Sequence, residues 1–420
     1  MTTLLEHARQ LDASDELAPF REQFIFPTND RGERLIYLCG NSLGLQPKGV
    51  RARLETELED WGRLGVEGHF HGRNPWYDYH EFLAPAMAKV VGAREHEVVV
   101  MNALSVNLHL MMVSFYRPTP TRYKILIEGG AFPSDQYAVA SQAAFHGFDP
   151  DVAIEELVPR PGEHTLRAED IEARIKALGQ ELALVMIGGV NYYTGQAMPM
   201  ARITRAGHAV GARVGFDLAH AVGNLALQLH DDGADFAVWC SYKYLNSGPG
   251  GVAGAFVHER HAQDPTLPRF AGWWGNDPKT RFEMSETFVP QRGAAGWQLS
   301  NAPVLTMASL WASLELFEQA GMARLRAKSV QMTRFMLEAI DSIGADRFEV
   351  ITPRDPQARG CQLSIRAKQD GPELFEDLTK AGIVCDFRRP DVIRVAGAPL
   401  YNSFEDVARF CEILKQVDEG

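Results

Sequence analysis

Short apolar runs alternate with helical patterns through the middle of the chain, from about residue 90 to residue 260. Uninterrupted apolar runs of this kind are typical of strands buried on both faces. We predict strands at 98–101, 124–128, 182–187, 213–217, 236–240 and 253–258, and helices at 106–116, 134–146, 168–178 and 198–210. This alternation predicts an α/β fold, in which right-handed crossovers build a mostly parallel central sheet covered by helices.

The two ends of the chain have a different pattern. The pattern in residues 1–50 predicts a helix, a short strand at 35–38 and a turn. A long helix at 303–342 precedes short strands at 348–351, 361–365, 383–386 and 392–395 and helices at 371–381 and 403–417. We predict a large domain at 51–325, a smaller α+β domain at 326–420, and a segment at 1–50 that contributes to the functional site and the small domain.

Composition narrows the class of protein. A chain of 420 residues exceeds what one hydrophobic core usually serves. Its net charge of −12 argues against nucleic acid or an anionic membrane as partner. We find neither a membrane span nor a secretory signal. The cysteines lack C-x-x-C spacing, which favours free thiols in the cytoplasm over disulfides or a zinc site; they are residues 39, 240, 361, 385 and 411.

Two polar residues follow predicted strands and suit one cofactor. Asp217 ends the run 213–217, and Lys243 follows the run 236–240. Ligands bind beyond the carboxyl ends of parallel strands, so we expect both side chains at one rim of the sheet. A lysine amine can form an imine with the aldehyde of pyridoxal 5'-phosphate while a carboxylate keeps the pyridine nitrogen protonated. Taken singly, each residue has a simpler explanation: Asp217 as a turn or helix-capping residue, and Lys243 as a solvated loop residue.

Two other segments after predicted strands carry matching groups. Phe132 offers a flat ring to stack on the pyridine, and Asp135 offers an acceptor. The alternative is that Ser134 or Asp135 caps the following helix. Leu104 and Ser105 begin a predicted helix whose first amides suit a phosphate, although serine is also an ordinary N-cap there.

Further candidate groups are spread along the chain. Tyr242 offers a phenol beside the lysine, and Trp273 an indole N–H, unless it closes a core edge or a dimer contact. Asn301 supplies an amide just before the long helix. Arg394 is a charge inside an apolar strand and suits an amino-acid carboxylate, with an internal Asp or Glu partner as the alternative. His69 lies in an aromatic segment suited to an aryl group; no Cys or carboxylate completes a metal-ligand set there, so we predict no metal.

Several longer motifs resemble those of one family. They are Leu38-Cys-Gly-Asn-Ser-Leu-Gly-Leu-Gln-Pro47, Met101-Asn-Ala-Leu-Ser-Val-Asn-Leu-His109, Ala131-Phe-Pro-Ser-Asp135, Tyr193-Thr-Gly-Gln196, Val214-Gly-Phe-Asp-Leu-Ala-His-Ala-Val-Gly-Asn224, Trp239-Cys-Ser-Tyr-Lys-Tyr-Leu-Asn246 and Pro399-Leu-Tyr-Asn-Ser-Phe404, together with the shorter Gly272-Trp273, Ser300-Asn301 and Ile393-Arg-Val-Ala396. Over nearly its whole length the chain resembles the kynureninases, which are fold-type-I pyridoxal phosphate enzymes of the aspartate aminotransferase superfamily.

The resemblance implies a role for each matching residue. Lys243 would carry the cofactor as a covalent aldimine, Asp217 would pair with its pyridinium, and Tyr242 would transfer protons. The other cofactor-binding residues would be Leu104, Ser105, Phe132, Pro133, Ser134, Asp135, His220, Trp273 and Asn301, some of them across a dimer interface. The substrate-binding residues would be Arg394, Asn41 and Ser42 for the carboxylate, and His69 and Ser300 for the aryl group. The family commonly has threonine at the position of Ser105.

The implied reaction belongs to tryptophan catabolism. It is the hydrolysis of L-kynurenine, or of its 3-hydroxy form, to anthranilate or 3-hydroxyanthranilate and L-alanine by a cytoplasmic homodimer. One alternative is another enzyme of the same fold, such as a cysteine desulfurase or an aminotransferase. A desulfurase needs a mobile nucleophilic cysteine, whereas Cys361 and Cys385 fall in predicted strands and Cys411 in a predicted helix. A catalytically silent binding protein is the other alternative, and the presence of lysine, carboxylate and phosphate-binding residues argues against it.

Overall fold

The computed structural model describes residues 3–261, 264 and 266–417. Its centre is a seven-stranded sheet in the order β4-β10-β9-β8-β7-β5-β6. β10 runs antiparallel to both of its neighbours, so the other strands all point the same way, as predicted for a mostly parallel sheet. The strands are β4 (Val98–Val100), β5 (Lys124–Glu128), β6 (Ile154–Leu157), β7 (Leu182–Gly188), β8 (Arg213–Asp217), β9 (Phe236–Trp239) and β10 (Gly254–Val257).

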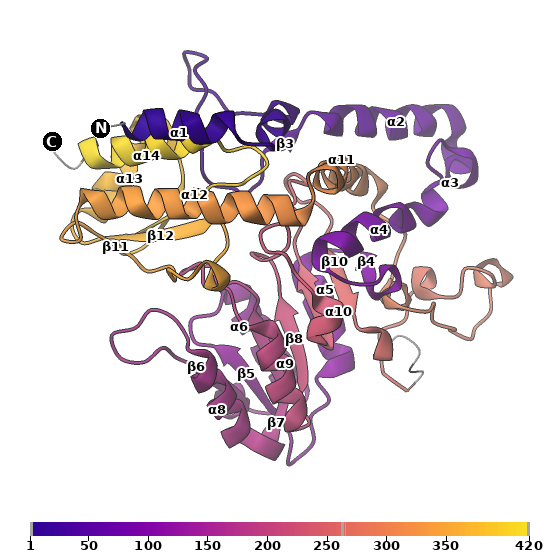
Figure 1. Ribbon diagram of the computed structural model, residues 1–420. Coiled ribbons are helices and arrows are strands. Elements are labelled where there is room, and N and C mark those ends of the chain that lie inside the picture. The colour runs from indigo at the N-terminus through magenta and orange to yellow at the C-terminus, as the bar shows by residue number, and fades with distance from the viewer. Residues whose placement is uncertain (1–2, 262–263, 265, 418–420) are drawn as a thin grey trace.

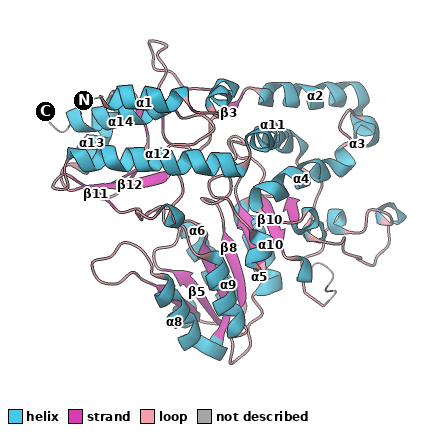
Figure 2. Ribbon diagram, viewed as in Figure 1, coloured by secondary structure: helices cyan, strands magenta, loops and turns pink. Residues whose placement is uncertain are grey.

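Alternate side chains of these strands enter two separate cores, which explains the uninterrupted apolar runs. In β7, Val185 and Ile187 belong to the core that includes helices α8 (Ala168–Leu178) and α9 (Met200–Ala209). Leu184 and Met186 belong to the core on the other face, with α5 (Leu104–Phe115) and α6 (Pro133–Phe145). Figure 2 shows the strands flanked by helices. The pattern did not predict the edge strand β6, because two glutamates interrupt its apolar residues.

A smaller antiparallel sheet lies beside the N-terminal segment. Its order is β11-β12-β15-β14, with β11 (Phe348–Val350), β12 (Gln362–Ala367), β15 (Val392–Ala396) and β14 (Asp386–Arg388). It shares a core with α12 (Met322–Ile343), α13 (Gly371–Lys380) and α14 (Phe404–Val417). Helix α1 (Leu4–Ala13) lies along α14 in Figure 1, and β2 (Ile36–Tyr37) pairs with β13 (Ile383–Val384). Helix α1 therefore packs on helix α14, so the N-terminal segment joins the small C-terminal sheet.

The single long helix predicted at 303–342 is wrong. The structure has two helices, α11 (Val304–Ala320) and α12, separated by Gly321 with a φ of 76°. That φ is accessible to glycine at little cost, and it ends the first helix. The apolar pattern continues on both sides of the glycine, so periodicity could not reveal the break. No helix within the described ranges is long and apolar enough to cross a membrane.

Candidate active site

Loops at one rim of the central sheet meet at a single cavity. The loops that follow β4, β5, β7, β8 and β9 all contribute, because these strands are parallel to one another. Of the residues singled out from the sequence, the cavity is lined by Leu104, Ser105, Phe132, Ser134, Asp135, Asp217, His220, Tyr242 and Lys243. Its other lining residues, which the sequence had not singled out, are Glu128, Gly188, Val190, Tyr192, Ala219 and Cys240.

Lys243 points its amine into this cavity. Its Nζ lies 3.0 Å from His220 Nε2 and 5.9 Å from the centroid of the Phe132 ring. Burial lowers the pKa of His220 well below its usual value, and the charges of Lys243 and Arg394 lower it further. A neutral imidazole accepts a hydrogen bond from the lysine amine. The carboxyl groups of Asp135 and Asp217 interact with this amine electrostatically. The amine is therefore held by a neutral partner that an incoming aldehyde can replace.

Three buried carboxyl groups line the same cavity. Asp217 ends β8, and its Oδ1 accepts a hydrogen bond from the Ala219 backbone at 2.7 Å. Burial raises the pKa of Asp217 and also that of Asp135, whose carboxyl lies close enough to share a proton with Asp217. Burial raises the pKa of Glu128 to about 7. Carboxyl groups crowded in this way favour a cationic ligand, such as a protonated ring nitrogen.

Unpaired polar atoms indicate that the cavity suits a polar ligand. Asp135 Oδ1 and His220 Nδ1 are buried and have no hydrogen-bond partner among the described residues. Such atoms are uncommon in folded proteins because an unsatisfied buried group costs free energy. Both belong to residues that line the cavity, so a ring with polar substituents and a protonated nitrogen, such as pyridoxal phosphate, fits the groups present.

Two helices begin at the cavity without side-chain caps. The N-cap of α5 is Ala103, and the N-cap of α6 is Phe132; neither makes a side-chain capping bond. The alternative interpretation of Ser105, Ser134 and Asp135 as N-caps is therefore wrong. Free backbone N–H groups at the start of a helix attract anions, and Ser105 adds a hydroxyl beside them. The start of α5 is accordingly the best site for the phosphate.

Arg394 contacts a residue of the cavity lining but already has an anionic partner. The side chain is 1% exposed and forms an ion pair with Asp386, as the alternative from the sequence anticipated. Its Nη1 donates to the carbonyl of Tyr192 at 2.6 Å, and Tyr192 lines the cavity. Ser42 Oγ donates to Asp386 Oδ2 at 2.5 Å and lies 3.4 Å from the Arg394 guanidinium. Any substrate carboxylate bound by Arg394 must share it with Asp386.

The N-terminal turn lies against the lysine loop. The Gly44 backbone N–H donates to the Tyr242 carbonyl at 2.8 Å. A Cβ at Gly44 would lie 2.3 Å from the Lys243 carbonyl oxygen, so only glycine allows this approach. Asn41 is buried in the same turn, and its Nδ2 donates to Gln362 Oε1 at 3.2 Å. Asn41 thereby packs against β12, and its neighbour Ser42 is the residue of this turn that contacts Arg394.

Eight of the residues predicted to contact cofactor or substrate do not line the cavity. They are Asn41, Ser42 and Arg394, described above, and Pro133, His69, Trp273, Ser300 and Asn301. Pro133 is the first residue of α6, whereas Ser300 and Asn301 are exposed. His69 and Trp273 belong to a group of contacting rings on the surface, where Phe70, Phe282 and Trp273 are 49%, 56% and 43% exposed. We call this group the aromatic surface cluster; it comprises His69, Phe70, Tyr77, Trp273 and Phe282.

A second, larger cavity lies away from these residues. It has a volume of about 610 Å³ and is lined by the N-terminal segment and by residues of α13 and α14. Its charges are largely paired with one another: Arg21 makes two bonds of 2.8 Å to Asp406, and Arg409 bonds Glu405 at 2.7 Å. It brings together no lysine, acid and aromatic ring in the way that the first cavity does.

The five cysteines are poor nucleophiles. All are free thiols, and burial raises the pKa of Cys39 to about 11 and those of Cys361 and Cys411 to about 12. Cys361 lies just before β12 and Cys385 between β13 and β14, so their predicted placement inside strands is off by one residue. A buried, protonated thiol cannot serve as the mobile nucleophile of a desulfurase.

Comparisons with known proteins show which families and folds the chain resembles. Residues 325–414 match the family model described as the kynureninase C-terminal domain. The chain is 60% identical to a kynureninase of Myxococcus xanthus over 97% of this chain and 96% of the relative. Among solved structures, the cysteine desulfurase CsdA of Escherichia coli matches with a TM-score of 0.77 at 16% identity, covering 96% of this chain and 98% of that one. A mutant of C-DES, solved with glycine covalently linked to its pyridoxal phosphate cofactor, matches with a TM-score of 0.75 at 18% identity, covering 93% of this chain and 99% of that one.

The sheet topology and the lysine–aspartate cavity define a fold-type-I pyridoxal phosphate enzyme. The likeness to the desulfurases extends to the fold alone, since the identity is low. The chain belongs to the kynureninase family, because the match at 60% identity extends over nearly its whole length.

Proposed function

We propose that this chain hydrolyses the Cβ–Cγ bond of L-kynurenine, and of its 3-hydroxy form, to give anthranilate or 3-hydroxyanthranilate and L-alanine. The observation that supports this best is the convergence of Lys243, Asp217 and Phe132 on one cavity in a chain of the kynureninase family. Pyridoxal phosphate, when bound to Lys243, supplies the electron sink that allows bonds to the substrate carbons to break.

The side chains around the cavity hold the cofactor in this proposal. Asp217 keeps the ring nitrogen protonated, and Phe132 stacks on the ring. Ser105 and the first amides of α5 bind the phosphate. The remaining cofactor shell comprises Leu104, Pro133, Ser134, Asp135, His220, Tyr242, Trp273 and Asn301.

Lys243 and Tyr242 move the protons. Lys243 would take the proton from the substrate Cα. Burial and the neighbouring Cys240 raise the pKa of Tyr242, so its phenol keeps its proton at neutral pH. We assign it the proton transfers at the hydrated carbonyl and at the alanine carbon. Tyr242→Phe should lower kcat by about 100-fold or more, as expected for loss of a general acid–base group. A wild-type rate with an unchanged burst of anthranilate would contradict this role.

Arg394, with Asn41 and Ser42, is the proposed clamp for the substrate carboxylate. His69 and Ser300 are the proposed contacts for the aryl group. Both lie outside the cavity of their own chain, as do Trp273 and Asn301. We therefore propose a homodimer in which the partner protomer supplies these residues. Exposed rings in contact, as in the aromatic surface cluster, are typical of a protein interface.

We further propose a cytoplasmic location and keep the predicted domain boundaries. Five free thiols are consistent with the reducing cytoplasm. We keep the division into a segment at 1–50, a large domain at 51–325 and a small domain at 326–420, which places Arg394 on the small domain and Lys243 on the large one.

The test is release of anthranilate, followed by its fluorescence, from L-kynurenine and 3-hydroxykynurenine with and without added cofactor. Lys243→Ala should abolish product formation and the absorbance band of the lysine-bound cofactor, which borohydride removes. Lys176→Ala, on an exposed face of α8, should retain both. Sulfide from L-cysteine, with no anthranilate, would instead identify a desulfurase. Absence of the band in the wild-type protein would indicate a catalytically silent relative.

A further inference from the structure

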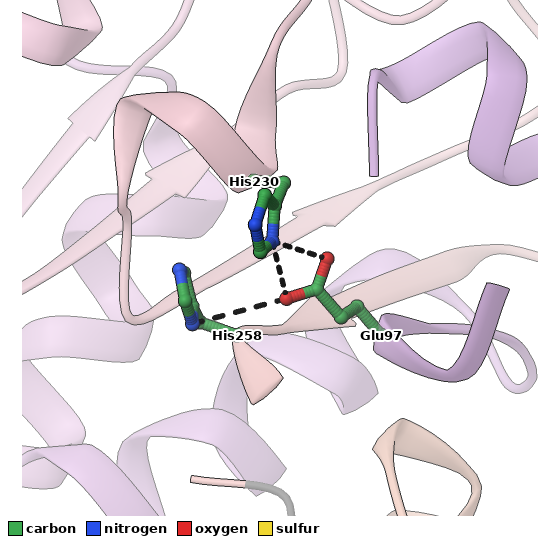
Figure 3. Close-up of side chains that lie close together, drawn as sticks. All are labelled: Glu97, His230 and His258. Carbon is green, nitrogen blue, oxygen red and sulfur yellow. Dashed lines mark hydrogen bonds and ion pairs between the residues drawn. The ribbon is translucent and has the colours of Figure 1, made fainter. Parts of the chain in front are cut away.

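Two imidazoles and a carboxylate meet at the rim of the central sheet opposite the cofactor cavity. Glu97 precedes β4, His258 follows the antiparallel strand β10, and His230 lies in α10 (Leu229–Asp232). The cofactor cavity lies beyond the other end of β4, at Ser105. The three residues are far apart in the sequence and are brought together by the fold (Figure 3).

The spacing of their ligand atoms suits one metal ion. His230 Nδ1 lies 3.0 Å from Glu97 Oε1 and 3.1 Å from Oε2, and His258 Nδ1 lies 3.8 Å from Oε1. All three ligand atoms lie within 4.8 Å of one another. Zinc–ligand bonds of about 2.0–2.2 Å in a tetrahedron place two ligand atoms about 3.3–3.6 Å apart, which the observed values bracket.

Hydrogen bonding accounts for only part of this arrangement. A bond from His230 to Glu97 is an ordinary explanation for that pair. His258 Nδ1, however, accepts a 3.2 Å bond from the Arg260 backbone N–H, so this nitrogen carries a lone pair and no proton. This nitrogen therefore cannot donate to the Glu97 oxygen 3.8 Å away, and a cation that took the place of the Arg260 N–H at Nδ1 would bind both acceptors.

The surroundings orient the carboxylate and leave access from solvent. Glu97 is buried and accepts backbone bonds from Arg94 at 2.9 Å and Glu259 at 2.8 Å. Such outer bonds fix a ligand in place, as in known metal sites. The His230 and His258 side chains are 22% and 13% exposed, so an ion can enter and keep water as a further ligand. The nearby Arg94 and Arg260 are paired with Glu259 and Asp235 and do not face the site as free cations.

We propose that Glu97, His230 and His258 bind a divalent ion of the zinc class, which ties the start of β4 to α10 and to the end of β10. One carboxylate and two imidazoles are a ligand set that zinc accepts with water as a fourth ligand. The two rings are nearly parallel, with 22° between their planes, so their in-plane lone pairs do not point at one ion. Binding therefore requires the His258 ring to turn toward Glu97. The role is structural, because the cofactor cavity lies at the other end of the strands.

The test uses the holoenzyme, stripped with a chelator and reloaded with Zn²⁺ or Co²⁺. We expect one ion per chain after gel filtration, visible Co²⁺ bands of tetrahedral intensity, and a Tm raised by Zn²⁺. His258→Asn should weaken binding by about 10-fold or more and remove the Tm rise. The matched control is His208→Asn, which alters another histidine–carboxylate pair, with Asp235, and should bind like the wild type.

Glu97→Gln is the second variant, with folding checked by circular dichroism. His258→Asn keeps the backbone bonds to Glu97, so the test stands even if Glu97→Gln does not fold. Absence of a retained ion in the wild type, or undiminished binding in His258→Asn, would overturn the proposal. In the first case the three residues form hydrogen bonds and bind no ion, and in the second the ion binds elsewhere. Anthranilate release at 25 °C should be the same in His258→Asn and the wild type.

Discussion

At the scale of single residues, burial makes a charged pair beside the cavity costly. Arg394 and Asp386 form an almost fully buried pair, with side chains 1% and 14% exposed. Burial lowers the pKa of Arg394, and the negative charge of Asp386 opposes that effect. The sequence indicated that a buried arginine needs an anion, but it could not tell a substrate carboxylate from an internal aspartate eight residues away. The structure places the aspartate there and leaves the substrate to compete with it.

Asp386→Asn should therefore destabilise the protein and make it more responsive to carboxylates. Loss of one partner of a buried pair costs about 3–5 kcal/mol, because the remaining charge is left without its partner. L-alanine offers a carboxylate that can take the place of the lost anion. We expect L-alanine to raise the Tm of Asp386→Asn by more than it raises that of the wild type. Asp341→Asn, which removes an exposed pair with Arg354, is the control, and L-alanine should raise its Tm by as much as that of the wild type. Equal increases in Asp386→Asn and the wild type would show that Asp386 and the ligand do not share Arg394.

Glu128 should give stability a pH dependence. Its pKa rises from 4.5 to about 7 because it is buried. Between these pH values the folded state holds a proton that the unfolded state releases, so this residue's contribution to stability is complete below pH 4.5 and declines as pH rises to 7. Glu128→Gln has no such proton. Its free energy of unfolding should exceed that of the wild type by roughly 3 kcal/mol at pH 8, from about 1.4 kcal/mol for each pKa unit, and by little at pH 4.5.

Urea unfolding of the holoenzyme at several pH values measures this difference. Asp135 and Asp217 titrate in both proteins, so their effects largely cancel in the comparison. Glu156→Gln, at an exposed position in the neighbouring strand β6, should show no such trend. A difference between Glu128→Gln and the wild type that does not change with pH would mean that Glu128 is ionised throughout.

At the scale of elements, the sequence predicted the strands and helices that local apolar patterns determine. Strands buried on both faces read as apolar runs, and their polar ends identified Asp217 and Lys243. Glu128 also ends a strand, but a single glutamate there carries no signal of its own; only the parallel neighbours place it in the cavity. The break at Gly321 was missed because apolar spacing continues through it. Glu97, His230 and His258 could not have been found by spacing, because three separate elements bring them together.

The two uncapped helix starts also show where prediction from the sequence ends. Serine and aspartate near a predicted helix start are normally capping residues, and the sequence left that alternative open. The structure places the N-caps earlier, at Ala103 and Phe132, so the side chains of Ser105 and Asp135 are available to a ligand. One or two residues in the position of a helix start decide between the two interpretations, and patterns do not resolve helix ends that finely.

At the scale of the whole molecule, one protomer carries a divided set of residues. The lysine, the aspartate and the stacking ring line the cavity, whereas Trp273 and His69 lie in the aromatic surface cluster. A two-fold dimer presents the same surface from both chains, so each cluster can contribute to the partner's site. The division predicts that inactive chains can complement each other.

Mixed dimers test this division directly. Lys243→Ala removes the anchor in the chain's own cavity, whereas Trp273→Ala alters the site of the partner. In a dimer with one chain of each kind, one site has an intact lysine and receives an intact tryptophan, and the other has neither. Random mixing makes half of the dimers mixed, so activity should recover to about one quarter of the wild-type value. Lys243→Ala mixed with Asp217→Asn should recover none, because both changes lie in the cavity of their own chain. If the first mixture also stays inactive, Trp273 acts within its own chain and the proposed interface is wrong.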